Sequence, residues 1–75
     1  MQQFEIDAIR TQSQNAFNSA ALAGRINTVA ACRKAMRTNE KAAEICAKAG
    51  LCEIAADHAE IVEIFSRAIE RTNAV

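Results

Sequence analysis

Apolar residues recur every three or four positions through the last third of the chain. An α-helix turns once in about 3.6 residues, so this spacing places them along one side of a helix. The side runs from residue 51 to 72 and includes Leu51, Ile54, His58, Ile61, Phe65 and Ile69. Such a side must be covered, because tertiary packing rather than intrinsic propensity holds most helices together. We therefore expect a helix over 52–73 that builds the core.

The rest of the chain is equally suited to helix. It has no proline and two glycines, and alanine fills 17 of its 75 positions. Alanine, glutamate, lysine, arginine and glutamine are strong helix formers, and no window alternates apolar and polar residues as a strand would. The sequence predicts an all-α fold in one domain, residues 1–75.

Three further helical segments precede the last one. They cover about 2–23, 26–36 and 40–49, and short connections between them favour antiparallel neighbours. Two of these segments could join into one longer helix through Thr38 and Asn39. The expected architecture is thus an antiparallel bundle of three or four short helices.

Residues at the predicted ends fit known capping patterns. Gly24 is expected to end the first helix, or else to be tolerated inside one long helix at a cost of about 1 kcal/mol. Either Asn27 or Thr28 could cap the start of the next helix. Gly50 followed by Leu51 is typical of a glycine cap with an apolar residue folding back onto the last turn. This last signal is the clearest in the chain.

A chain of this length buries little surface by itself. Only 18 of its residues are Ile, Leu, Val, Phe or Met. We therefore expect a homo-oligomer, most simply a dimer, with residues 51–69 forming its core and oligomer face.

Cysteine usage and hydropathy indicate the compartment. Cys32, Cys46 and Cys52 are odd in number, and the chain opens with no basic-then-apolar leader. Its longest uninterrupted apolar run has four residues, far short of a membrane span. The expectation is a cytoplasmic protein with no membrane partner.

His58 is the only histidine and the main candidate for chemistry. It could act as a ligand, a general base or a pH switch, but it lies on the apolar side of its helix, where a packed ring satisfied locally is the commoner role. The sequence shows no evident nucleophile for it, no glycine-rich elbow and no phosphate-binding loop.

A metal site is also considered. Cys46, Cys52 and His58 are six residues apart, whereas helical metal ligands prefer spacings of three or four, and cysteines often only fill space. Paired carboxylates such as Glu60 and Glu63 fit a solvated surface. The sequence predicts no enzyme, no cofactor and no metal.

Charge is divided along the chain although the net charge is zero. Residues 25–41 hold five basic side chains and one acidic one, and residues 42–63 hold five acidic and one basic. The candidate partner-binding residues are Arg33, Lys34, Arg37 and Lys41. Three of them, spaced by four, could contact phosphates or an acidic protein. Alternatively, the basic and acidic stretches face each other within or between subunits.

Residues 57–70 resemble the second helix of a tetratricopeptide repeat, with Ile61, Phe65 and Ala68 at its packing positions. The first-helix tryptophan, Leu-Gly and tyrosine positions have no equivalents, and the closing proline is absent. The resemblance covers fourteen residues and implies a peptide-binding adaptor.

These observations favour a non-enzymatic protein-binding module, a small adaptor, inhibitor or regulator acting through helix faces. Its expected partners are itself and another protein. The alternative is a small dimeric nucleic-acid-binding regulator that uses the basic segment 25–41.

Overall fold

Three helices form the protein in the computed structural model, which describes residues 2–73. They are α1 (Gln3–Ile26), α2 (Val29–Lys48) and α3 (Cys52–Asn73). No strand occurs in this part of the chain, so the all-α prediction is confirmed. The number of helices is three, because the second and third predicted segments form one continuous helix.

The two turns follow from local capping. Thr28 accepts a hydrogen bond from the Ala31 amide at 3.2 Å and so begins α2. At the end of α2, Gly50 adopts φ +80° and the Leu51 amide donates to the Cys46 carbonyl at 2.9 Å. This is the bond pattern of a glycine-capped helix end, as the sequence predicts.

One predicted cap is wrong. Gly24 lies inside α1 rather than after it, and the helix continues to Ile26. Asn27 takes the left-handed conformation instead, with φ 56°, and its amide donates to the Ala23 carbonyl at 2.8 Å. Asparagine tolerates this conformation better than other non-glycine residues, and a glycine inside a helix costs only about 1 kcal/mol.

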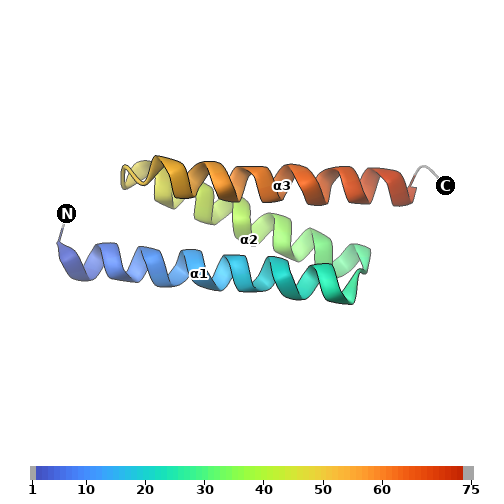
Figure 1. Cartoon of the computed structure of the whole chain (residues 1–75), viewed down its shortest axis with the longest axis horizontal. Coiled ribbons are helices and arrows are strands. Elements are labelled where there is room, and N and C mark those ends of the chain that lie inside the picture. Colours follow the sequence, from blue (N-terminus) through green and yellow to red (C-terminus); the bar gives the residue numbers. More distant parts are fainter. Residues whose placement is uncertain (1, 74–75) are drawn as a thin grey trace.

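The helices are arranged with α2 between the other two. In Figure 1, α1 and α3 run in the same direction, and the fainter α2 crosses behind them from the start of α3 to the end of α1. Helix α2 packs extensively against both neighbours, whereas α1 and α3 meet over a short stretch. The molecule is elongated, measuring 48 × 18 × 14 Å over its Cα atoms.

Small residues fill the helix contacts. The buried apolar residues are Ala16, Ala20, Ala23, Cys32, Ala35, Ala42 and Cys46. The larger apolar side chains whose burial is described, from Phe4 to Ile69, all remain at least partly exposed. The alanines let the backbones approach closely, and the bulky side chains lie around the contacts rather than inside them.

Candidate functional site

The centre of the bundle holds three polar side chains, one from each helix. Ser13 of α1, Asn39 of α2 and His58 of α3 are all buried, with exposed fractions of 4%, 0% and 0%. The Ser13 Oγ lies 2.6 Å from the His58 Nε2, and the His58 Nδ1 lies 2.7 Å from the Asn39 Oδ1. We call these residues the polar centre.

The hydrogen bonds of Asn39 define the proton positions in the polar centre. Its Nδ2 donates to the carbonyls of Ala35, at 2.8 Å, and Ala16, at 3.2 Å, which leaves its Oδ1 as an acceptor. The His58 Nδ1 must then carry the proton, and its Nε2 accepts from the Ser13 hydroxyl. No buried side-chain nitrogen or oxygen in the described chain lacks a partner.

Phe17 of α1 completes the surroundings of the histidine. Its ring stacks on the His58 ring with centroids 4.0 Å apart and planes inclined by 12°. Burial lowers the pKa of His58 below its usual 6.5 because it penalises the charged ring, and the neighbouring Asp57 carboxylate offsets part of this effect. Neutral His58 is therefore the form that the fold favours.

The order of groups in the polar centre matches that of a serine nucleophile, a general base and an orienting group. This arrangement is nevertheless sealed, since Ser13 and His58 expose almost no surface to a substrate. The sequence predicts that His58 packs its ring and that its ring nitrogens are hydrogen-bonded, and the structure shows both. The expectation of local partners is wrong, because both nitrogens bond to residues on other helices, 45 and 19 positions away.

The sequence reasoning did not single out Ser13 or Asn39. A usable signal existed in each case, since both are polar residues within an apolar side repeating every three or four positions. Ser13 lies between Ile9 and Ala16, and Asn39 between Ala35 and Ala42. A polar residue at the middle of every helix's buried side suggests mutual contact, but no spacing rule indicates which residues pair.

The predicted core-building side of α3 faces the other helices. His58 is buried, while Leu51, Ile54, Ile61, Phe65 and Ile69 are half-buried. The structure therefore places five of these residues on the side of α3 that packs against its neighbours, and Leu51 immediately before the helix.

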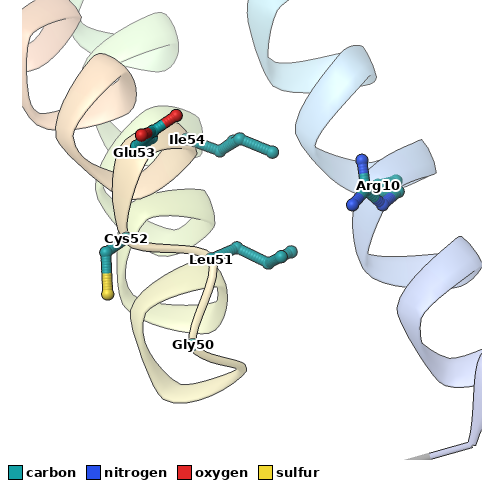
Figure 2. Close-up of a pocket in the computed structure, with 6 residues that line it drawn as sticks. All are labelled: Arg10, Gly50, Leu51, Cys52, Glu53 and Ile54. Atoms are coloured by element: carbon teal, nitrogen blue, oxygen red, sulfur yellow. The ribbon is translucent and has the colours of Figure 1, made fainter.

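A hollow of about 480 Å³ opens where α1 and α3 separate at one end of the bundle. Figure 2 shows the side chains of Leu51 and Ile54 reaching from the start of α3 towards Arg10 on α1, while Cys52 points away. Gly50 and Glu53 complete the lining. The lining of the hollow includes two aliphatic side chains, one cation and one carboxylate, in no arrangement with catalytic geometry.

The three potential metal ligands considered from their spacing do not come together. Cys46 and His58 are buried and Cys52 is exposed, and no group of three or more potential ligands could hold a metal ion within residues 2–73. In the same part of the chain, no helix is long and apolar enough to cross a membrane.

The basic candidates lie on the outside of α2. Because α2 is unbroken, Arg33, Arg37 and Lys41 follow one another along one side, and they and Lys34 are exposed. In the described chain the ion pairs are Glu44–Lys48 and Glu63–Arg67, each between residues four apart on one helix, and neither involves these four residues. No ion pair joins the basic and acidic stretches within residues 2–73, and the start of α2 lies beside the end of α3.

Charge is instead separated between the two ends of the bundle. The end with the α2–α3 turn, formed by residues 2–14 and 39–62, carries three basic and seven acidic side chains. The opposite end, formed by 15–38 and 63–73, carries six basic and two acidic ones. The two ends thus have net charges of −4 and +4, and the molecule is a strong dipole.

The most exposed large apolar side chains of α1 share one side of that helix. Phe4, Leu22 and Ile26 are 71%, 54% and 51% exposed. Phe4 and Leu22 are eighteen residues apart, about five full turns, and Ile26 is one turn further. Ser13 is nine residues from both, so this side points away from the polar centre. The exposed residues along it are Phe4, Ala8, Thr11, Asn15, Leu22 and Ile26. We call them the outer α1 stripe.

No protein-family model, curated protein or solved structure matches this chain. The likeness of residues 57–70 to a tetratricopeptide helix is therefore not accompanied by a family match. The fold defines the class: a three-helix antiparallel bundle with a polar centre and an exposed apolar stripe on one outer helix.

Proposed function

We propose that this chain is a non-enzymatic protein-binding module and that the outer α1 stripe is its docking surface. The observation that carries the proposal is the exposure of Phe4, Leu22 and Ile26 along one side of an outer helix. Large exposed apolar side chains that share one side of a helix can pack against a partner helix. Helix α1 suits such a role because only its opposite side packs on the bundle.

The distribution of chemistry within the molecule supports the same proposal. The arrangement Ser13–His58–Asn39, which has catalytic order, is sealed, and its polar atoms are satisfied by one another and by backbone carbonyls. Its position at the meeting point of all three helices suits it to fixing their register. A buried polar contact that is satisfied in only one alignment disfavours the others.

The proposal is tested by affinity capture with the tagged chain in extract of its own cells. The wild-type chain is compared with Leu22→Glu, and the matched control is Ile64→Glu, which alters an equally exposed isoleucine on α3. We expect the wild type and the control to retain the same protein, identified by mass spectrometry, and Leu22→Glu to lose it. Capture that is unaffected by Leu22→Glu, or no protein contact of any kind, would contradict the proposal.

A second candidate function is nucleic-acid binding by the outside of α2. It is favoured by the continuity of α2, which aligns Arg33, Arg37 and Lys41, none of which has an acidic partner among residues 2–73. Such a surface would bind phosphates, and each lost contact would reduce the dependence of log affinity on log salt by about 1. The test is retention on a nucleic-acid column, which Arg33→Glu with Arg37→Glu should abolish if this candidate is correct.

A further inference from the structure

The outer α1 stripe is uncharged, and its larger side chains lie at its ends. Phe4 is near the start of α1 and Leu22 and Ile26 are near its end, while Ala8, Thr11 and Asn15 lie between them. A helix with this pattern matches a copy of itself running the opposite way. Residues whose numbers add to 30 then lie opposite each other, so Phe4 meets Ile26, Ala8 meets Leu22, and Asn15 meets Asn15. Smaller residues in the middle let the two backbones approach.

Charges beside the stripe select the same orientation. Asp7 and Arg25 are eighteen residues apart, about five turns, so they flank the stripe on the same side. Both are exposed, and neither forms an ion pair with a described residue. In an antiparallel helix pair, matching flanks meet, which brings Asp7 of each copy beside Arg25 of the other. In a parallel pair, opposite flanks meet instead, so Asp7 and Arg25 of the two copies would lie on opposite sides of the contact.

The whole molecule shows the same complementarity. An antiparallel pair places the −4 end of each copy against the +4 end of the other, and a parallel pair stacks like ends. Opposite charge on facing surfaces guides association and disfavours wrong orientations, more than it adds affinity. The stripe supplies the apolar contact, and the charged ends of the bundle determine the relative orientation of the two copies.

The exposed area leaves room for a partner of this kind. The chain exposes 5134 Å², whereas a compact protein of its mass exposes about 4,500 Å². The excess approaches the roughly 800 Å² that each partner buries in a typical protein interface.

We infer that the occupant of the outer α1 stripe is a second copy of this chain, packed α1 against α1 in antiparallel orientation about a two-fold axis near Asn15. The inference rests on the proposed function, because it names the partner of the same surface. It also places the contact between copies on α1, rather than on residues 51–69.

Sedimentation equilibrium of the purified chain from 1 to 100 μM, on the order of the concentrations where modest dimers form, tests whether the copies associate. We expect a dimer in the wild type and in Ile64→Glu. Phe4→Glu and Leu22→Glu should each raise the dissociation constant at least about tenfold, because they place a carboxylate in the apolar contact. Circular dichroism confirms that the variants stay helical. A monomer at the highest concentration, or a dimer indifferent to both substitutions, overturns the inference.

Disulfide trapping tests the orientation. In a Cys52→Ser background, which removes the exposed native thiol, Asn15→Cys should form a covalent dimer on mild oxidation because its two copies meet at the axis. Phe4→Cys should not cross-link with itself, but should cross-link with Ile26→Cys in a mixture. Efficient self-linking of Phe4→Cys would indicate parallel pairing and overturn the inference.

Charge exchange supplies an independent readout. Asp7→Arg should weaken the dimer several-fold, and adding Arg25→Asp should restore it, which a parallel pair would not do.

Sedimentation and affinity capture together separate this inference from the proposed function. If the chain is a monomer but captures a different protein, and Leu22→Glu loses that protein, then the inference of a second copy is overturned and the docking surface is supported. A monomer that captures nothing overturns both.

Discussion

The polar centre and the outer α1 stripe reverse the usual distribution of polar and apolar residues. His58, Asn39 and Ser13 are almost fully buried, while Phe4 and Leu22 on α1 are more than half exposed. The difference shows that burial here depends on what can fit between closely packed helices and satisfy its hydrogen bonds. Alanine and a mutually bonded polar set meet those conditions, and bulky side chains do not.

The two regions differ in what holds them in place. The polar centre is fixed by directional bonds from three helices, so each of its members depends on the others. The stripe residues contribute little to holding the bundle together, because most of their surface is already in water. Substitutions in the two regions should therefore have opposite signatures, with large effects on folding in the first and on association in the second.

The largest effect is expected from His58→Ala. The change removes the ring stacked on Phe17, creates a cavity and leaves Ser13 and Asn39 without their partner, so the free energy of unfolding should fall by about 3 to 5 kcal/mol. Urea denaturation measures this loss. Glu60→Ala on the exposed side of the same helix is the control and should be nearly neutral. A loss below about 1 kcal/mol would mean that the polar centre does not hold the bundle together.

Acidification should produce the next largest effect. Because burial lowers the pKa of His58 in the folded chain, the unfolded chain binds more protons, and stability falls as the pH drops below 6.5 towards the folded pKa. The slope in this window should reach at most about 1.4 kcal/mol per pH unit for the single proton. Thermal unfolding from pH 7.5 to 5 measures it, with His58→Gln as the comparison. An equal slope in both proteins would assign the effect to other groups.

Gly24→Ala should raise stability by about 0.5 to 1 kcal/mol without altering association. Gly24 lies inside α1, outside both the polar centre and the stripe, and an added Cβ would meet no atom within 4 Å. The variant tests whether the stability of α1 or its exposed side chains control association. A more stable helix with an unchanged dissociation constant of the dimer would show that the side chains of the outer α1 stripe control it. The matched substitution Gly50→Ala should destabilise, because position 50 has φ +80°.

The smallest effect on folding is expected from Phe4→Ser. Phe4 is already 71% exposed, so the free energy of unfolding should change by no more than about 0.5 kcal/mol. It is measured at protein concentrations below the dissociation constant of the dimer. Hydrogen exchange of dilute protein can follow this change. A loss comparable with that of His58→Ala would show that Phe4 belongs to the core and would remove the contrast between the two regions.

The helices and most of their ends could be predicted from local patterns in the sequence. Helix propensity, spacing and capping act between residues a few positions apart. The caps at Thr28 and Gly50 and the apolar side of α3 could therefore be predicted from the sequence. Gly24 was misjudged because a single glycine costs too little to end a helix, and Asn27 could take the left-handed turn instead.

Which residues come into contact could not be predicted from the sequence, because it depends on how the helices cross. Ser13, Asn39 and His58 are brought together across 45 and 19 positions by the crossing of three helices, and no local pattern encodes such a pairing. The same applies to the exposed side of α1, whose apolar residues look in the sequence like any other helix-packing residues. Which of its two sides is left open depends on where α2 and α3 lie, because burial is a property of neighbours rather than of residues.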